Sequence, residues 1–381
     1  MSVTAAEGFV AGGAAVGIKA GGLLDLALID AGRPVPAVGV FTSNTAAAPP
    51  VHLSRLHLED GMARAVVINS GCANAATGDA GMAAAESTAA VVASHLGCET
   101  TDVVVCSTGP IGRVVPVAKI EEGLGRLDLD RQGGAAAAEA ILTTDSRSKQ
   151  EIVKGEGYVV GGMAKGAGMM RPDMATMLAF LTTDARVETP VLRSVLQRAV
   201  SRSFNALDID GCESTNDTVV LLSSGASGVT PAPEELASTV ELVCRRLARQ
   251  MAEDAEGATR VVTIELDGAA DDETALLLAR AVADSALVRS SFFGADPNWG
   301  RLVAALGATR VPFDLDAVSV SYQGVVVAEK GTDAGADHDQ IAETLSGDFT
   351  VGISVGVGPG SCSLLTTDLT PDYVRFNGER S

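Results

Sequence analysis

The sequence has few aromatic residues and no long uninterrupted hydrophobic run. Aromatic side chains make up 3% of the 381 residues, so the core must be built mainly from small aliphatic side chains packed close to backbone. No segment approaches the roughly 18 uninterrupted apolar residues that a membrane-spanning helix needs. The apolar stretch near the N-terminus contains glycines and follows no basic segment, unlike a secretory signal. A cytoplasmic protein is therefore expected.

Positive charge is also scarce. Lys and Arg number 28 against 48 Asp and Glu, which gives a formal net charge of −20. This balance repels the phosphates of nucleic acids and the headgroups of anionic membranes. The sequence therefore predicts neither a nucleic-acid partner nor a membrane partner.

Patterns for binding a metal or a nucleotide are missing as well. The six cysteines form no C-x-x-C pair, and the four histidines do not stand at ligand spacing to them. Neither a P-loop nor a G-x-G-x-x-G fingerprint is present. We expect no metal and no cofactor.

The chain alternates between short Val- and Ile-rich runs and Ala-rich helical stretches. The runs at 39–44, 65–71 and 102–109 end in Gly, Ser, Asn or Thr, which is typical of buried strands that lead into polar loops. A hairpin is predicted around Gln323 and Gly324. Together with 46% hydrophobic residues, this pattern predicts one large α+β unit with stacked sheets. Helices are predicted at 81–96, 135–142, 190–202, 233–254 and 271–288, and later strands at 259–266 and on both sides of 358–360.

One segment, from Lys165 to Leu178, combines flexible glycines, a lysine and a Pro-containing turn ahead of an apolar strand. In a structural interpretation the segment is a β-turn, and Thr176 is one more strand residue. In a functional interpretation the Thr176 hydroxyl attacks the carbonyl of Ala175, and cleavage leaves Thr176 with a free α-amine. That amine has an ordinary pKa of roughly 7.7 to 8.0, so it can act as the base for its own hydroxyl.

The sequence resembles the ornithine acetyltransferases, the bifunctional glutamate N-acetyltransferases of arginine biosynthesis. The segment KGAGMMRPDMATML, which begins at Lys165, is similar to the family's autoproteolysis and nucleophile signature. The resemblance runs along nearly the whole chain. It includes FTSNTAAAPPV from Phe41, NSGCANAATG from Asn69, STGPIG from Ser107, TTDSRSK from Thr143, STNDT from Ser214, DAEGATR from Asp254, DPNWGR from Asp296 and YVRFN from Tyr373.

This resemblance implies a self-cleaving acyltransferase with an α/β/β/α-like fold, similar to that of the N-terminal-nucleophile enzymes. Cleavage between Ala175 and Thr176 would give an α chain, residues 1–175, and a β chain, residues 176–381, which form one catalytic unit. Thr176 would take the acetyl group from N-acetylornithine and pass it to glutamate in a ping-pong reaction. The resemblance also implies an α2β2 heterotetramer.

The resemblance assigns further residues to the site. Thr108 and Gly109 match the family's oxyanion hole, through a hydroxyl and a backbone N–H. Substrate contacts fall on Thr143, Lys165, Thr176, Glu256, Asn377 and Ser381. Lys165 suits a substrate carboxylate, and Glu256 suits the side-chain ammonium of ornithine.

Some of these positions also have plain structural interpretations. Glu256 follows a predicted helix and would serve equally as a solvated residue after its last turn, and Thr143 would serve as a helix end. The closing residues Asn377 to Ser381 depart from the family pattern because they lack its Tyr. Arg171 and Pro110 stand where many relatives have smaller or aliphatic residues.

Three other functions remain open from the sequence. A self-cleaving amidohydrolase or aminopeptidase would use water in place of glutamate, and a secondary-metabolism paralogue would use another acceptor. A non-catalytic binding protein of this fold would not need the intact Thr176. The sequence leaves open whether acetyl-CoA is also a donor.

Overall fold

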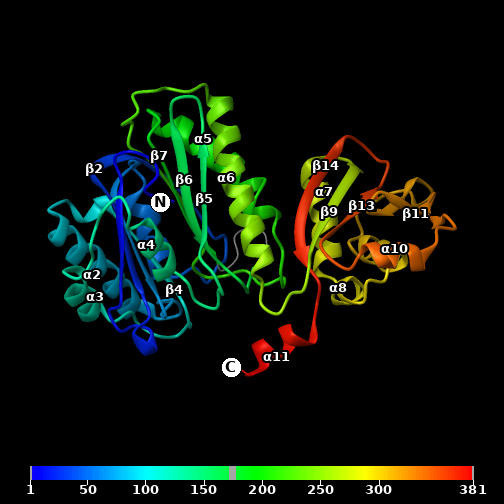
Figure 1. The fold of residues 1–381 in the computed structure, drawn as a ribbon, viewed down its shortest axis with the longest axis horizontal. Helices are drawn as coiled ribbons and strands as arrows, with labels where there is room; N and C mark the ends of the chain where they lie inside the picture. Colours follow the sequence, from blue (N-terminus) through cyan, green and yellow to red (C-terminus); the bar gives the residue numbers. More distant parts are fainter. Residues whose placement is uncertain (1, 171–176, 380–381) are drawn as a thin grey trace. The chain divides into compact units, whose positions relative to one another are not determined.

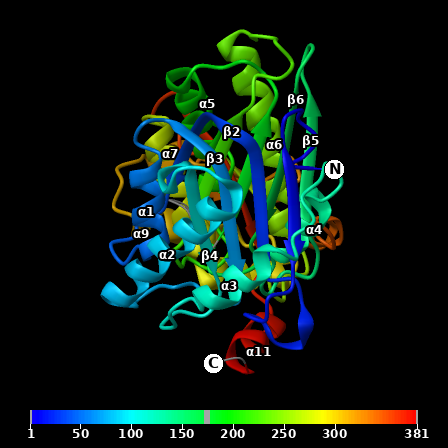
Figure 2. The same ribbon diagram turned by 90° about the vertical axis from the view of Figure 1, so that its left-hand side faces the viewer.

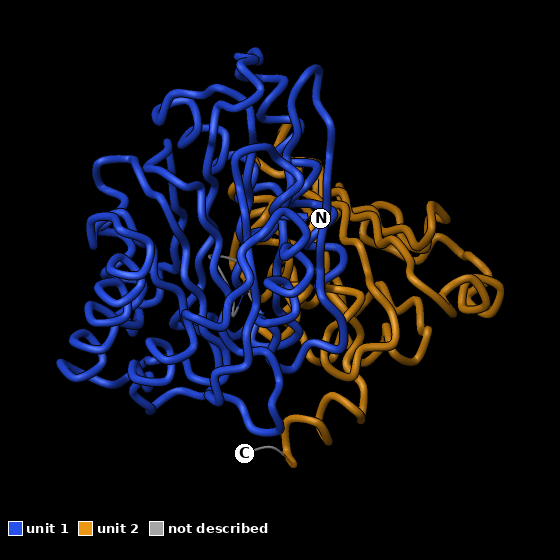
Figure 3. Tube along the Cα trace, turned by 60° about the vertical axis from the view of Figure 1, so that its left-hand side comes forward, with its two compact units in different colours: residues 1–205, 212–251 blue, residues 206–211, 252–381 orange. Residues whose placement is uncertain are grey.

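The computed structural model describes residues 2–170 and 177–379. The chain forms two compact units, coloured separately in Figure 3. Unit 1 comprises residues 1–205 and 212–251, and unit 2 comprises residues 206–211 and 252–381. Each unit is described by itself below.

Within its described residues, unit 1 holds an eight-stranded sheet with the order β4-β3-β2-β8-β7-β6-β5, and β1 pairs with β2. The strands are β1 (Val10–Ala14), β2 (Leu26–Phe41), β3 (Met62–Ser70), β4 (Val103–Thr108), β5 (Lys149–Lys154), β6 (Val159–Lys165), β7 (Leu178–Thr183) and β8 (Thr218–Ser223). The helices are α1 (Pro49–His57), α2 (Gly78–Leu96), α3 (Val117–Leu124), α4 (Gly134–Ala140), α5 (Thr189–Ser201) and α6 (Pro233–Glu253), whose last two residues belong to unit 2.

The two halves of this sheet face each other across a shared core. Alternate residues of β3 point to opposite sides, as expected for a strand: Val66 and Ile68 pack with residues of β7 and β8, whereas Ala65 and Val67 pack with residues of α2 and α3. Figures 1 and 2 show α2 and α3 over the outer face of β3 and β4, with α5 and α6 on the far side. The predicted α+β class with stacked sheets and flanking helices is confirmed.

Strand β2 links the two halves of the sheet. Its first part pairs with β1 and β3, its last part pairs with β8, and the register with β3 shifts between Asp30 and Val35. The sequence pattern predicts a strand only at 39–44, so the first part of β2 was not predicted. Pro34 and Pro36 lie within β2, and proline inside a run normally argues against a strand.

Unit 2 contains, among its described residues, a six-stranded sheet with the order β12-β11-β10-β13-β9-β14. Its core combines residues from the sheet and from the helices packed on it. The strands are β9 (Val261–Ala269), β10 (Ser319–Tyr322), β11 (Val325–Glu329), β12 (Thr332–Asp333), β13 (Phe349–Ser354) and β14 (Gly360–Thr367). The helices are α7 (Asp272–Asp284), α8 (Ala286–Phe293), α9 (Trp299–Ala308), α10 (His338–Thr344) and α11 (Pro371–Glu379).

The structure of unit 2 confirms the predicted hairpin and corrects two other predictions. The hairpin of β10 and β11 turns at Gln323 and Gly324, both with positive φ, as a tight two-residue turn requires. The single helix predicted at 271–288 is two helices, α7 and α8, because the backbone of Ser285 is extended. The strands on either side of 358–360 do not pair with each other, because β9 lies between β13 and β14.

Candidate active site

Thr108 and Gly109, the predicted oxyanion hole, lie at the end of β4, a strand whose residues are all buried. Gly109 has a φ of 137°, which residues with a Cβ atom rarely adopt. A Cβ at this position would also lie 2.5 Å from the backbone nitrogen of Cys72. The position therefore requires glycine. In residues 2–170 and 177–379 the Gly109 N–H has no hydrogen-bond acceptor.

Lys165, a predicted substrate contact, is brought directly to Thr108. It is the last residue of β6, it is 1% exposed, and its Nζ donates a hydrogen bond of 3.0 Å to Thr108 Oγ1. Because the hydroxyl accepts this hydrogen bond, its own hydrogen remains available to donate to another atom. Two residues that lie 57 positions apart in the sequence thus meet at one place in unit 1.

Asp145 accepts hydrogen bonds from two backbone N–H groups, those of Thr143, another predicted substrate contact, and of Gly166, which follows Lys165. Its Oδ2 accepts from the Thr143 N–H at 3.0 Å, its Oδ1 accepts from the Gly166 N–H at 2.7 Å, and it forms a buried ion pair with Lys149. Burial alone would raise the pKa of Asp145, but the charges of Lys165 and Lys149 and these hydrogen bonds outweigh it and lower the pKa to about 2. This carboxylate is therefore ionised at neutral pH.

Asn216 and Asp217, just before β8, hold the ends of neighbouring strands. Asn216 Nδ2 donates to Ser107 O at 3.0 Å and also to Ala73 O, and Asp217 Oδ1 accepts from the Met177 N–H at 2.8 Å. Asp217 is completely buried, and burial raises its pKa well above the usual range.

These buried polar residues were not predicted from the sequence. Asp145 and Lys149 fall within the segment TTDSRSK, and Asn216 and Asp217 fall within STNDT. The one sequence feature that could have pointed to them is their position within these motifs. Composition and spacing do not distinguish a buried charged residue from an exposed one.

The predicted cleavage site and nucleophile, Ala175 and Thr176, lie outside the described residues, as does Ser381. Met177 is the first described residue after them, and it is 2% exposed.

Glu256 and Asn377 belong to unit 2. The half-buried Glu256 stands in a turn whose next residue, Gly257, approaches the backbone of α11 so closely that a Cβ would lie 2.3 Å from Tyr373 N. Asn377 is exposed on the same helix, where its Nδ2 donates to Tyr373 O at 3.1 Å. The structure thus places the Glu256 turn against the helix that carries Asn377.

Comparison with known proteins agrees with the resemblance. A family model described as "ArgJ family" matches residues 10–381. This chain belongs to the ArgJ family. It is 46% identical over 384 residues to the "Arginine biosynthesis bifunctional protein ArgJ" of Thermobifida fusca, with all of both chains covered. It is 45% identical over 390 residues to the protein of the same name from Mycobacterium tuberculosis, with all of this chain and 96% of the relative covered.

A crystal structure of the ArgJ protein from Bacillus halodurans is also similar, with 31% identity and a TM-score of 0.51. The match covers 52% of this chain and 98% of the crystallised chain. The family predicted from the sequence is confirmed, and with it the class of acyltransferase enzymes of arginine biosynthesis.

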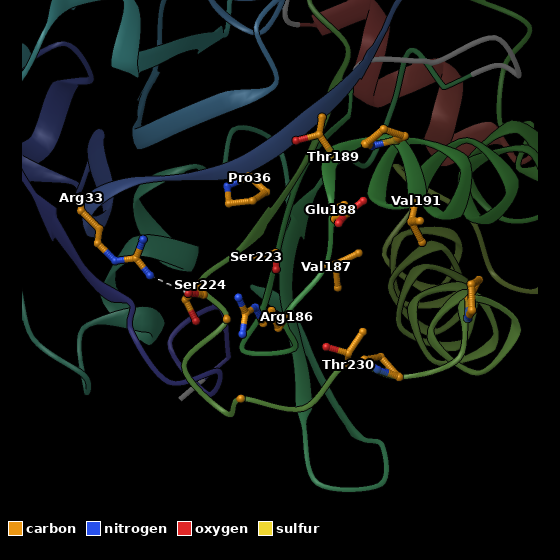
Figure 4. A pocket seen from close by; sticks show the side chains of 15 residues that line it. Arg33, Pro36, Arg186, Val187, Glu188, Thr189, Val191, Ser223, Ser224 and Thr230 are labelled. Carbon is orange, nitrogen blue, oxygen red and sulfur yellow. Dashed lines mark hydrogen bonds between the residues drawn. The ribbon is translucent and has the colours of Figure 1, made fainter.

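Other features of this ArgJ-family chain lie apart from the site. A pocket of about 890 Å³ in unit 1 is lined by Arg33, Arg186 and Glu188 among others, and none of the predicted site residues lines it (Figure 4). Among the described residues no group of three or more His, Cys, Asp or Glu could hold a metal ion. In the same part of the chain no helix is both long and apolar enough to cross a membrane.

Proposed function

We propose that the chain cleaves itself between Ala175 and Thr176, and that Thr176 then transfers acetyl from N-acetylornithine to glutamate. The observation that carries this proposal is the arrangement at the end of β4. There the Thr108 hydroxyl accepts from Lys165, and the Gly109 N–H has no acceptor in the described part of unit 1. Two donors at the end of a buried strand suit the oxyanion of an acyl-transfer intermediate.

The proposed reaction has two half-reactions. The α-amine of Thr176 takes the proton of its hydroxyl, and Oγ1 attacks the acetyl carbonyl of N-acetylornithine. Thr108 and Gly109 donate to the oxyanion. The C–N bond then breaks, the proton passes to the amine of ornithine as it leaves, and the acetyl group stays on Thr176 as an ester. The amine of glutamate attacks this ester, loses its proton and restores the free hydroxyl.

The remaining predicted contacts each bind a different part of the substrate. Lys165 binds the carboxylate that both amino acids share, and Thr143 and Asn377 add hydrogen bonds. Glu256 binds the side-chain ammonium of ornithine. Ser381 stays a predicted contact from the resemblance. Asp145 supports this scheme because it holds Thr143 and the residue after Lys165 in place.

The proposal includes an α chain of residues 1–175 and a β chain of residues 176–381 that assemble as α2β2 in the cytoplasm. Two observations support cleavage into halves that stay together. β6 and β7, which lie on either side of the proposed cleavage site, pair as antiparallel neighbours. The match to the crystallised relative from Bacillus halodurans covers 52% of this chain and 98% of the crystallised chain. The crystallised chain is therefore about half as long as the chain described here.

Mass spectrometry and an assay of ornithine release test the proposal. The purified chain should appear as two fragments that meet between Ala175 and Thr176, and Thr176→Ala should remain one chain without activity. Ornithine release from N-acetylornithine should depend on glutamate. Release at the same rate without glutamate would contradict acetyl transfer and support an amidohydrolase. A parallel assay with acetyl-CoA as the donor should give less N-acetylglutamate than N-acetylornithine does.

A further inference from the structure

Asp217 lies beside the residue that follows the proposed nucleophile. β7 and β8 are parallel neighbours with Leu178 opposite Thr218, so the residues before each strand, Met177 and Asp217, are also side by side. The Met177 N–H donates to Asp217 Oδ1 at 2.8 Å. The backbone of Asp217 is held as well, because its carbonyl accepts from the Thr42 N–H at 3.0 Å.

The side chain of Asp217 is completely buried, with Oδ1 held by the Met177 N–H and with Ser214 near enough to lower the pKa of the carboxyl group. Oδ2 has no hydrogen-bond partner in the part of the chain that the structure describes. A buried polar atom without a partner destabilises a fold, so packing alone does not account for this carboxyl group. Burial also raises its pKa well above the usual range, which favours the neutral acid. A neutral carboxyl group still accepts a hydrogen bond through its carbonyl oxygen.

We infer that Asp217 is a positioning residue for acyl transfer: its Oδ1 fixes the backbone N–H of Met177, the residue that follows the proposed nucleophile in the sequence. This inference rests on the proposed role of Thr176 as the nucleophile. The requirement is for an acceptor atom at Oδ1, not for a negative charge. Reacting groups must be held within a fraction of an ångström, and a displacement of about 1 Å can slow a reaction about 100-fold.

Two substitutions separate the acceptor from the charge. Asp217→Asn keeps an acceptor oxygen of the same shape without the charge, and Asp217→Ala removes the acceptor. We expect Asp217→Asn to cleave itself, and to turn over, within about threefold of the wild-type chain. We expect Asp217→Ala to slow both processes tenfold or more, with the loss in kcat and little change in KM. If Asp217 only stabilised the fold, Asp217→Ala would not lower kcat while leaving KM unchanged, and Asp217→Asn would not retain the wild-type rate.

Thr218→Val is the matched control on the next residue. It removes a buried hydrogen bond of 3.0 Å from Thr218 Oγ1 to Asn216 O and keeps the backbone hydrogen bond of 3.3 Å from the Thr218 N–H to Met177 O. It should cleave at the wild-type rate, and the melting temperatures of all three variants show whether they fold. If the Ala variant does not fold, the Asn variant decides alone, because an Asn variant that folds but is tenfold slower or worse overturns the acceptor role.

The wild-type chain separates the two proposals. If the wild-type chain is not cleaved between Ala175 and Thr176 and does not transfer acetyl, the proposed function is wrong, and so is this inference, which depends on it. If the wild-type chain splits and Asp217→Ala splits equally fast, only the positioning role of Asp217 is overturned.

Discussion

The hydroxyl hydrogen of Thr108 is the smallest feature on which the proposed chemistry depends. Thr108→Val keeps the shape of the side chain but removes that donor. Losing one oxyanion donor typically lowers kcat about 100- to 1000-fold, or about 2.7 to 4 kcal/mol. We expect a loss of this size in acetyl transfer from N-acetylornithine to glutamate. Thr108→Ser, which restores a hydroxyl, should recover most of the rate, and a fully active Val variant would contradict the assignment.

Gly109 illustrates strain at a single position. Gly109→Ala would combine a φ of 137° with a Cβ 2.5 Å from Cys72 N. The matched control is Gly112→Ala, where φ is 87° but nothing lies within 4 Å of the new Cβ. We expect the control to cost about 1 to 2 kcal/mol of unfolding free energy and Gly109→Ala clearly more, as measured by urea denaturation. Equal losses would show that the contact with Cys72 is unimportant.

The ion pair of Asp145 makes the stability depend on pH. Its folded pKa is lowered from 3.8 to about 2, because the nearby lysines and hydrogen bonds outweigh burial. A depressed carboxylate pKa stabilises the fold above the unfolded value, and this contribution is lost as the pH falls through the folded value. The stability advantage of wild type over Asp145→Asn should shrink by about 2 kcal/mol from pH 5 to pH 2 in urea denaturation.

An exposed carboxylate provides the control for that measurement. Asp372 pairs with Arg375 on the surface of α11, where both side chains are about two-thirds exposed. The difference between wild type and Asp372→Asn should stay nearly constant over the same pH range, because such pairs contribute little. An Asp145→Asn difference that is equally constant would contradict the proposed ionisation.

At the level of elements, the break between α7 and α8 depends on one cap. Ser285 Oγ accepts from the Val288 N–H at 3.3 Å, and Ser285→Ala should destabilise unit 2 by about 1 kcal/mol. Trp299 is the only tryptophan in the sequence and packs against the core of this unit, so its fluorescence can follow unfolding in urea. Ser290→Ala, within α8, should change the midpoint little. A Ser285 variant as stable as this control would exclude the capping role.

Elements with strong local signals were predictable from the sequence, and elements set by distant contacts were not. The hairpin at Gln323 and Gly324 could be predicted because the turn itself requires positive φ. The pairing of β13 and β14 with β9 was missed because the partner strand lies about 90 residues away in the sequence. Within the site, the position of Thr108 at a strand end was predictable. Its contact with Lys165 was not, because it depends on how the two halves of the sheet fold together.

At the level of the whole molecule, the proposed α and β chains alternate within one sheet. In the order β2-β8-β7-β6, the two central strands come from residues 176–381 and the two flanking strands come from residues 1–175. Separating the chains would break the pairing of β2 with β8 and of β6 with β7. It would also expose the core that these strands share with β3 and β4. The proposed cleavage before Thr176 would therefore cut the chain without dividing the fold.

This alternation predicts that the cleaved chains separate only when unit 1 unfolds. Size-exclusion chromatography in native buffer should give one peak that contains both fragments, even at high salt, because strand pairing and apolar packing hold them together. In rising urea, the fragments should separate at the concentration where circular dichroism reports loss of the sheet. Release of either fragment while the sheet stays folded would contradict the interleaved arrangement, since β7 and β8 cannot leave without opening both neighbouring strand pairs.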